Sequence, residues 1–205
     1  MKNVKGIWLP DQEFHLEGFA DQEGWRYQKH KFDACLKYIK NWDTAIDVGG
    51  HCGLWSMQMV EHFRRVYAFE PVPAHRECFE MNAPEAELIP CALGEKSGTV
   101  KLKWDARSTG NTKVAQDGDV TADLKTLDSF GIRNVGFIKI DCEGYEMNVL
   151  KGGEETIRKW HPVIIVEQKP NKAQEYGFEE TEAKDWLKKR GYKLQEVLAG
   201  DFILA

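Results

Sequence analysis

The sequence predicts an α/β fold with a mostly parallel sheet. Short apolar segments alternate with amphipathic ones from Thr44 onward, which is typical of parallel strands joined by helices. With 205 residues, 42% of them hydrophobic, the chain suits one domain with a full core. Its last residues form two apolar runs, Tyr192 to Leu198 and Phe202 to Leu204, around a turn. These predict an antiparallel hairpin at one edge of the sheet.

Five segments have the composition of buried parallel strands. They are Thr44 to Val48, Arg65 to Phe69, Ala86 to Cys91, Val135 to Ile140 and Val163 to Glu167. Helices are expected after Gly53, Pro73, Gly144 and Thr181. Pro73 suits a first helical turn, and Pro162 ends the helix that precedes the fifth strand.

One region departs from this alternation. Gly98 to Trp104 alternates like an antiparallel strand, and the polar segment Ser108 to Thr112 follows it. A hairpin and loop across the open end of the sheet are expected, where substrate loops lie. Trp104, Arg107 and the loop Ser108 to Thr112 are therefore the expected acceptor contacts, a solvated loop being the alternative.

The chain divides into a small N-terminal cap and a main domain. Residues 1–43 hold an aromatic-rich lead and a helix expected over Gly24 to Lys40, and residues 44–205 form the main domain. The net charge of -5 and the scattered basic residues argue against nucleic acid as a partner. A charged leader and an apolar run of the ~20 residues that span a bilayer are both missing, so a cytosolic location without membrane contact is expected. The five cysteines are widely spaced, which predicts reduced thiols.

The glycine turn after the first strand predicts the kind of cofactor. Asp47, Gly49 and Gly53 fit an acidic-x-Gly-x-x-x-Gly pattern rather than the GxGxxG of dinucleotide folds. Asp47 would repel a pyrophosphate but accept an ammonium group, directly or through water, which favours S-adenosylmethionine (SAM). Glu70, at the end of the next strand, is placed to accept ribose hydroxyls. A plain tight turn and a solvated strand end are the alternatives.

Several motifs, which follow one another along the chain, resemble those of a known family. Five segments resemble the motifs of FkbM family methyltransferases. They are DVGGHCG at Asp47 to Gly53, AFEP at Ala68 to Pro71, CALG at Cys91 to Gly94, IKIDCEGYE at Ile138 to Glu146 and VLKG at Val149 to Gly152. The resemblance implies a Rossmann-like class I methyltransferase fold and SAM as the cofactor. Family members are chiefly O-methyltransferases that act on hydroxyls of polyketides, sugars and glycans.

The turn and the resemblance together define the expected cofactor site. Its residues are Asp47, Gly49, Gly50, His51, Gly53, Glu70, Pro71, Cys91, Ala92, Leu93 and Asp141. The resemblance implies that Cys91 to Leu93 lie beside the adenine and that Asp141 lies near the methyl group. His51 stands where the family usually has Asn, and both residue types tolerate a left-handed backbone. We therefore expect His51 to serve the geometry of the turn, with catalysis as a base the alternative.

Three carboxylates are the expected catalytic residues. Asp141, Glu143 and Glu167 follow neighbouring strands, so they should converge on one crevice. Crowding would raise the pKa of at least one of them and make it a general base. No ligand spacing demands a metal, so none is predicted, although these oxygens suit a divalent cation.

Structural roles are the alternatives for two of these residues. Glu143 would cap the helix that begins at Gly144, because a negative charge is favoured there. Glu167 would pair with Lys139 or Lys169.

The sequence thus predicts a SAM-dependent methyltransferase that methylates a hydroxyl of a glycan or of a small hydroxylated metabolite. A nucleotide-dependent oxidoreductase of Rossmann type and a non-catalytic SAM-binding module are the alternatives. The pattern does not decide the acceptor, O- versus N-methylation or the oligomeric state, and a homo-oligomer is compatible with it.

Overall fold

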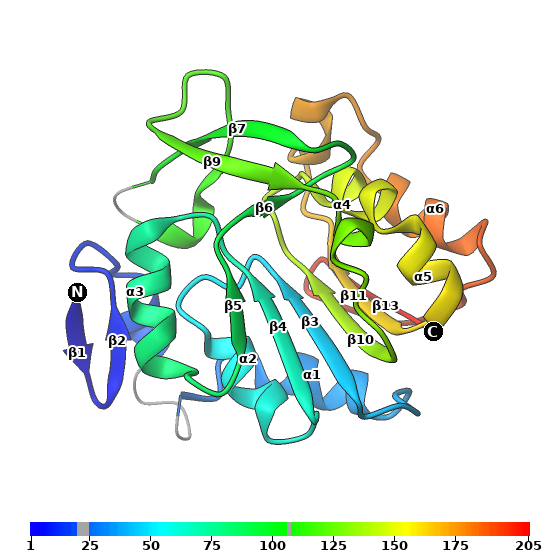
Figure 1. Cartoon of the computed structure of the whole chain (residues 1–205), viewed down its shortest axis with the longest axis horizontal. Coiled ribbons are helices and arrows are strands. Elements are labelled where there is room, and N and C mark those ends of the chain that lie inside the picture. Colours follow the sequence, from blue (N-terminus) through cyan, green and yellow to red (C-terminus); the bar gives the residue numbers. More distant parts are fainter. Residues whose placement is uncertain (20–24, 106–107) are drawn as a thin grey trace.

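The computed structural model describes residues 1–19, 25–105 and 108–205. Its centre is a seven-stranded sheet (Figure 1). The strand order is β12 (Leu194–Leu198), β13 (Asp201–Leu204), β11 (Val163–Glu167), β10 (Val135–Ile140), β3 (Thr44–Val48), β4 (Arg65–Phe69) and β5 (Glu87–Ile89). Strands β11, β10, β3, β4 and β5 are parallel, whereas β13 is antiparallel to β11 and to β12. The predicted fold class and the terminal hairpin are confirmed.

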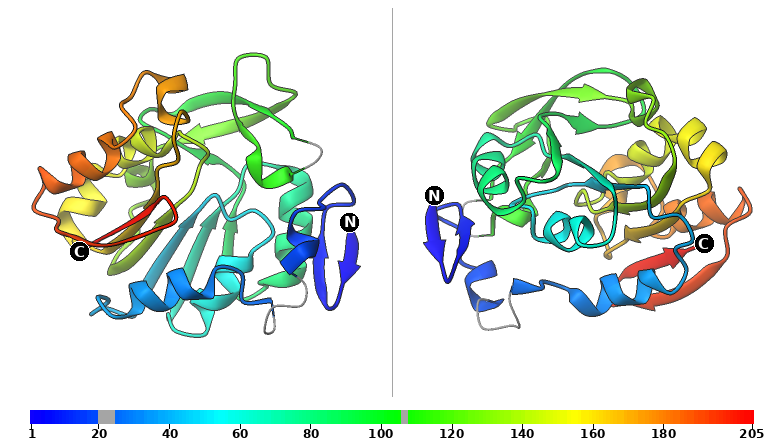
Figure 2. Two further views of the ribbon diagram at one scale, coloured as in Figure 1. Left: turned by 180° about the vertical axis from the view of Figure 1, so that it is seen from behind. Right: turned by 60° about the horizontal axis from the view of Figure 1, so that its bottom comes forward.

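In the described part of the chain, six α-helices pack around this sheet. They are α1 (Lys29–Leu36), α2 (Leu54–Val60), α3 (Pro73–Asn82), α4 (Glu146–Gly152), α5 (Glu154–Trp160) and α6 (Glu182–Lys188). Two successive residues of β10 show that both faces are buried: Phe137 packs among α1 and α2, and Ile138 packs among α4, α5 and α6. Figure 2 shows these two groups of helices, blue to cyan and yellow to orange, on opposite faces.

Three predicted elements differ from the structure. The strand expected over Ala86 to Cys91 is reduced to β5, because the next residues, β6 (Ala92–Leu93), join another sheet. The helix expected after Gly144 is two helices, α4 and α5, that meet at Gly153. A side chain there would lie 2.9 Å from Leu127, so the break is set by tertiary packing.

The N-terminal helix is also shorter than predicted. Gly24 lies outside the described residues, and α1 begins only at Lys29. Trp25 and Gln28 have φ values of 59° and 55°, in the left-handed region that a right-handed helix excludes. The helix therefore cannot start before them.

A second, four-stranded sheet lies across the carboxyl ends of the central strands (Figure 1). It contains β6, β7 (Gly98–Lys103), β8 (Lys113–Val114) and β9 (Val120–Lys125), and β7 pairs antiparallel with β8 and β9. The short 3-10 helix η3 (Thr109–Asn111) precedes β8. The expected hairpin and loop are thus placed above the open end of the main sheet.

The N-terminal residues form the hairpin β1 (Lys2–Val4) and β2 (Ile7–Leu9), which packs against α3. The Asn82 side chain donates to the Trp8 carbonyl and accepts from its N–H, both at 2.8 Å. All five cysteines are free thiols, as expected. Among the described residues, no helix is long and apolar enough to cross a membrane.

A buried ion pair joins the N-terminal helix to the C-terminal hairpin. The Lys31 ammonium on α1 lies 2.7 Å from an Asp201 carboxylate oxygen at the start of β13, with side chains 6% and 8% exposed. The other Asp201 oxygen has no hydrogen-bond partner among the described residues. Asp201 therefore depends on Lys31 for compensation of its charge.

We expect Lys31→Met to lower the free energy of unfolding by about 3–5 kcal/mol, because it leaves the Asp201 carboxylate buried and unpaired. The measurement is urea unfolding at pH 7. Lys29→Met is the matched control, since Lys29 on the same helix pairs with Asp33 near the surface and should change stability by less than about 1 kcal/mol. Equal effects of the two substitutions would contradict this role, and adding Asp201→Asn to Lys31→Met should restore part of the loss.

Candidate active site

The turn between β3 and α2 requires glycine. The N–H groups of Gly49 and Gly50 both donate to the Phe69 carbonyl, at 3.0 and 3.1 Å, which ties the turn to β4. Gly49 has φ +78°, and a Cβ there would lie 2.1 Å from the Asp141 carbonyl oxygen. His51 also has a left-handed backbone, with φ 47°, which is the conformation that its predicted geometric role requires.

Asp47 lies beneath this turn. It is fully buried, and its carboxylate accepts from the Ser56 hydroxyl at 2.8 Å and pairs with the Lys139 ammonium at 3.2 Å. Lys139 also donates to the Gly49 carbonyl at 2.7 Å. Burial opposes the charge of Lys139, but Asp47 and Asp141 outweigh it and raise the pKa of the ammonium.

The direct polar contacts of Asp47 are thus with the protein, and the predicted ammonium contact stays a prediction. Lys139 is a residue that the sequence reasoning considered only as a partner of Glu167. A lysine between two isoleucines in a strand buried on both faces was the signal for its structural role.

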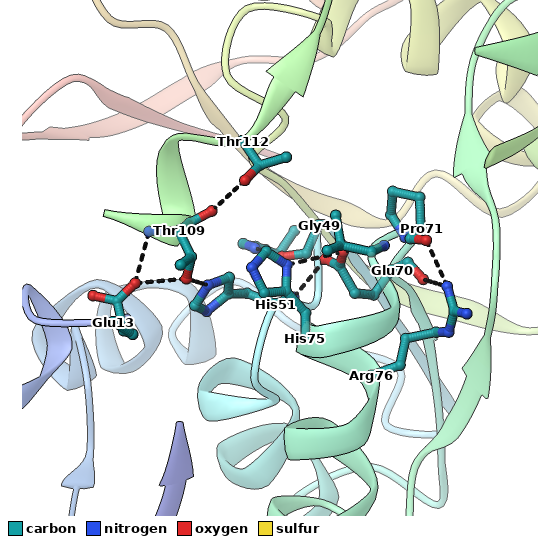
Figure 3. Close-up of polar contacts among 11 residues, drawn as sticks. Glu13, Gly49, His51, Glu70, Pro71, His75, Arg76, Thr109 and Thr112 are labelled. Atoms are coloured by element: carbon teal, nitrogen blue, oxygen red, sulfur yellow. Dashed lines mark hydrogen bonds and ion pairs between the residues drawn. The ribbon is translucent and has the colours of Figure 1, made fainter. Parts of the chain in front are cut away.

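Glu70 directly follows β4 and is held from three sides (Figure 3). One carboxylate oxygen accepts from the Val72 N–H at 2.8 Å and pairs with His75 Nδ1 at 3.1 Å, and the other accepts from the His51 N–H at 2.9 Å. Burial opposes the ionisation of Glu70, but His75 and these N–H groups outweigh it and lower its pKa. Glu70 is therefore a fixed anion beside the cofactor turn.

His75, on the first turn of α3, was not predicted from the sequence. Its ring is 2% exposed and lies 4.0 Å from the His51 ring, measured between ring centroids. Because Nδ1 faces the Glu70 carboxylate, Nδ1 carries the proton, and Nε2 has no hydrogen-bond partner among the described residues. One buried ring nitrogen is thus available to a ligand. Nothing in the local sequence distinguishes this histidine.

A first cavity collects most of the predicted cofactor residues. Its lining includes Gly49, His51, Glu70, Pro71, Cys91, Ala92, Leu93 and Asp141. The segment that holds Thr109, Gly110, Thr112, Lys113 and Val114 also lines it, and its volume is about 80 Å³. Ligand pockets usually measure roughly 300–1,000 Å³, so this segment must move outward when a nucleoside enters.

A second cavity, of about 450 Å³, shares Gly49 and His51 of the cofactor turn with the first. Its lining includes Glu13, Tyr27 and Gln28 from the N-terminal region and Ser108, Gly110 and Asn111 from the predicted acceptor loop. Gly50 lines this second cavity, whereas Asp47 and Gly53 line neither. Trp104 also lies outside both linings and packs near His75, with ring centroids 5.2 Å apart. Arg107 lies outside the described residues.

Glu13 connects the N-terminal region to the loop. Its buried carboxylate accepts from the Thr109 N–H at 2.8 Å and from the Thr109 hydroxyl at 2.6 Å (Figure 3). Since the hydroxyl proton goes to Glu13, the Thr109 oxygen accepts from His51 Nε2 at 2.8 Å. Burial and the neighbouring His75 lower the pKa of His51, so its ring is neutral.

The three predicted catalytic carboxylates do converge. One oxygen each from Asp141, Glu143 and Glu167 lies within 4.8 Å of the others. Asp141 and Glu143 line both cavities, and Glu167 lines the second. Oxygen ligands at this spacing suit a divalent cation, but lysines already pair with two of the three.

The ion pairs decide between the predicted structural roles. Glu167 pairs with Lys169 at 2.5 Å through Oε1, while its Oε2 is buried without a partner among the described residues. Glu143 pairs with Lys172 and makes no capping hydrogen bond to α4, whereas Glu146, the first residue of α4, accepts from the Cys142 and Gly144 N–H groups of the preceding turn. Burial and the nearby Asp141 raise the pKa of Glu167 to about 8.

The parallel sheet with its antiparallel hairpin and the site at the carboxyl ends of β3, β4 and β10 define a Rossmann-like class I methyltransferase. A family model described as "Methyltransferase FkbM domain" matches residues 47–194. The chain belongs to this family, and SAM is its cofactor.

Similar proteins agree with this assignment. Hexuronic acid methyltransferase AglP of Haloferax volcanii is 27% identical over 135 residues, covering 60% of this chain and 54% of that protein. Methyltransferase 1 of Beauveria bassiana is 26% identical over 141 residues, covering 52% and 57%. The chain thus spans little more than half the length of these relatives.

Solved structures share the fold. Methyltransferase FkbM from Methylobacillus flagellatus has a TM-score of 0.59 at 18% identity, covering 92% of this chain and 52% of that one. N-methyltransferase NodS from Bradyrhizobium japonicum, solved with S-adenosylhomocysteine (SAH), has a TM-score of 0.54 at 9% identity, covering 95% and 92%.

We expect Gly49→Ala to weaken SAH binding at least about tenfold, because the new methyl group collides with the Asp141 backbone and the positive φ becomes strained. Isothermal titration calorimetry measures this affinity. Gly98→Ala is the control, since a Cβ at Gly98 meets nothing within 4 Å and its φ is not positive. Wild-type affinity in a folded Gly49→Ala variant would contradict the tight approach at this turn.

Proposed function

We propose that the chain is an O-methyltransferase that transfers the methyl group of SAM to a hydroxyl of a glycan or of a small hydroxylated metabolite. The observation that carries this proposal is the wall shared by the two cavities. Gly49, His51, Asp141 and Glu143 line both. A nucleoside in the first cavity and an acceptor in the second would meet at this wall, as an in-line displacement requires.

Residues of the first cavity fit the parts of SAM. We place the ribose hydroxyls against Glu70 and the free Nε2 of His75, because both are buried groups that can form hydrogen bonds with hydroxyls. We place the adenine beside Cys91 to Leu93, which are apolar and buried. Asp141 then lies toward the methyl group, since it lines both cavities.

The carboxylates of the shared wall support acid–base chemistry. SAM, when bound, supplies an electrophilic methyl group on its sulfonium. Oε2 of Glu167 is free to take the proton of the acceptor hydroxyl, and its raised pKa suits a general base near neutrality. Asp141, which has no ion-pair partner among the described residues, orients the same hydroxyl. Lys172 holds Glu143 beside them.

The polar second cavity supports a hydroxylated acceptor. Tyr27, Gln28, Ser108 and Asn111 offer hydrogen-bonding groups there, and Trp55 offers an apolar face. The printed name of the relative AglP, a hexuronic acid methyltransferase, also supports a sugar-like acceptor. The family assignment removes the oxidoreductase alternative, and the free carboxylates in a cavity favour a catalyst over a passive SAM-binding module.

Several predictions from the sequence stay predictions. They are the division into a cap of residues 1–43 and a domain of residues 44–205, the cytosolic location, the independence from nucleic acid and from a metal, and the oligomeric state.

We expect Glu167→Gln to lower turnover by about 10²- to 10⁴-fold, because the amide cannot take the acceptor proton. The carboxylate form of wild-type Glu167 increases as the pH rises through about 8, so kcat/KM should rise over this range and then level off. The variant should lose this rise. SAH release at varied pH measures both effects. An unchanged pH profile in Glu167→Gln would show that another group is the base.

Two further variants separate catalysis from folding in the same assay. Asp141→Asn should lower turnover while SAH still binds, because Asp141 orients the acceptor. Glu85→Gln is the control, since Glu85 is exposed and lines neither cavity. Unchanged turnover in Asp141→Asn would remove Asp141 from the mechanism.

We expect His75→Phe to weaken SAH binding about tenfold, because the ribose loses one hydrogen-bond partner and Glu70 loses one of its donors. Calorimetry with SAH measures this, with His30→Phe on the exposed side of α1 as the control. NAD should not bind wild type. Unchanged SAH affinity in His75→Phe would exclude the ribose contact, and binding of NAD without SAH would overturn the cofactor placement.

A further inference from the structure

Two residues of the N-terminal region, Tyr27 and Gln28, present hydrogen-bond donors to the second cavity. We infer that the Tyr27 hydroxyl and the Gln28 amide bind the carboxylate of SAM, so that the amino-acid end of the cofactor lies in the second cavity beside the acceptor. Both residues precede the range 47–194 that the family model matches, so that match assigns them no role. The inference rests on the placement of the nucleoside in the first cavity under the proposed function.

The backbone of this segment is strained and held in place. Trp25 and Gln28 have φ values of 59° and 55°, which cost energy in residues other than glycine. The Gln58 amide on α2 donates to the Tyr27 carbonyl at 2.9 Å. The Trp55 indole N–H, also on α2, donates to Gln28 Oε1 at 2.9 Å. Because α2 directly follows the cofactor turn, these contacts fix the segment relative to that turn, and strain maintained in this way is typical of ligand sites.

The hydrogen-bond pattern leaves two protons for a ligand. Trp55 Nε1 is only a donor, so the Gln28 atom that faces it is the oxygen, and the amide nitrogen faces Tyr27. This nitrogen donates one proton to the Tyr27 hydroxyl oxygen at 3.1 Å and carries a second one. The Tyr27 hydroxyl therefore keeps its own proton to donate. Neither remaining proton has an acceptor in the described part of the chain.

The Tyr27 phenol remains a donor at neutral pH. Burial and the nearby Asp141 raise its pKa, and they outweigh the opposing charges of Lys169 and Lys139. The phenol is therefore uncharged and does not repel a carboxylate. The same effects show that Asp141 and Lys169 lie near the phenol, and both line the second cavity with it.

The bonding of the sulfur in SAM directs the amino-acid end to this cavity. The sulfur carries the ribose carbon, the methyl group and the amino-acid chain. With the nucleoside in the first cavity, the sulfur lies at the wall that the two cavities share. The first cavity measures about 80 Å³ and the second about 450 Å³, so the second has room for the chain and for an acceptor. Ser108 and Asn111 of its lining remain for the acceptor.

The charges of the second cavity suit a zwitterion. An amino acid carries an ammonium group and a carboxylate on one carbon, so it adds no net charge to the cavity. Asp141 has no ion-pair partner among the described residues, and one of its two oxygens can receive the ammonium group. Lys169 is 42% exposed and pairs only with Glu167 in the same part of the chain, so its ammonium supplies positive charge near Tyr27 for the carboxylate.

A pair of matched ligands tests this inference. SAH and its decarboxylated analogue share the adenosine, the sulfur and the amino group and differ in the carboxylate alone. Calorimetry at pH 7.5 measures the affinity of each ligand for wild type and for Tyr27→Phe, which removes the hydroxyl and keeps the ring that contacts Phe19. We expect Tyr27→Phe to weaken SAH binding about tenfold and to change the affinity for the analogue less than about twofold.

The matched control is Tyr38→Phe, since the Tyr38 hydroxyl contacts Glu196 and Tyr38 lines neither cavity. It should change neither affinity. Equal weakening of both ligands by Tyr27→Phe would show a structural role and overturn the inference. Unchanged SAH affinity in Tyr27→Phe would overturn it too, and a loss of turnover alone would assign Tyr27 to the acceptor.

A second variant reverses the preference at the same position. Gln28→Glu keeps an oxygen for Trp55 but places a negative charge where the amide donates, so it repels the carboxylate of SAH and not the analogue. We expect the ratio of the Kd for SAH to the Kd for the analogue to rise at least about tenfold over wild type. Gln116→Glu is the control, because Gln116 is exposed and lines neither cavity. A ratio that stays constant or falls in Gln28→Glu would contradict the carboxylate contact.

The same measurement separates this inference from the proposed function. Both ligands contain the ribose, so His75→Phe should weaken both by the same factor. Wild-type affinity for both ligands in His75→Phe, with the selective effect of Tyr27→Phe retained, would overturn the ribose contact and leave the carboxylate contact in place. Calorimetry contains no acceptor, so a failure of methyl transfer to hydroxyls would not change these affinities.

Discussion

One buried ammonium group, that of Lys139, holds the cofactor turn to the centre of the sheet. Register places Lys139 of β10 directly beside Asp47 of β3, and the same ammonium reaches the Gly49 carbonyl at the start of the turn. Asp47 is fully buried, and Ser56 is its other hydrogen-bond partner. Loss of Lys139 would leave a carboxylate in the core without a counter-charge, at a cost of roughly 3–5 kcal/mol. The position of the turn, and with it the wall between the cavities, depends on this contact.

Other acidic side chains near the carboxyl ends of the strands are compensated by basic side chains in the same way. Adjacent strands place Asp201, Glu167, Asp141, Asp47 and Glu70 in a row, and the partners of the row are Lys31, Lys169, Lys139 and His75. Within the described part of the chain, Asp141 is the member of this row without an ion-pair partner. A partly buried charge is costly unless a neighbouring group compensates it. The uncompensated carboxylate of Asp141 therefore marks the place where a ligand would supply the missing interaction.

The pattern of apolar residues in the sequence predicted most strands of the central sheet. Four of the five predicted strands begin and end at the observed residues, because a parallel strand covered on both faces is a continuous apolar run. The shorter α1 and the break at Gly153 follow from left-handed residues and from the side chain of Leu127, neither of which periodicity reveals. The carboxylate cluster was predictable because parallel topology brings strand ends together. Glu13 was not, since its partner Thr109 is 96 residues away.

The histidine at position 51 shows how one residue can serve both the backbone and a distant segment. Its left-handed φ would suit asparagine equally well. The imidazole of His51, which is longer than an asparagine side chain, contacts the Thr109 hydroxyl, and Glu13 accepts a hydrogen bond from that hydroxyl. Gly110, next to Thr109, lines both cavities. A movement that widens the narrow first cavity for a nucleoside must therefore displace part of the wall of the second. The geometry of the acceptor site is set by the same segment that admits the cofactor.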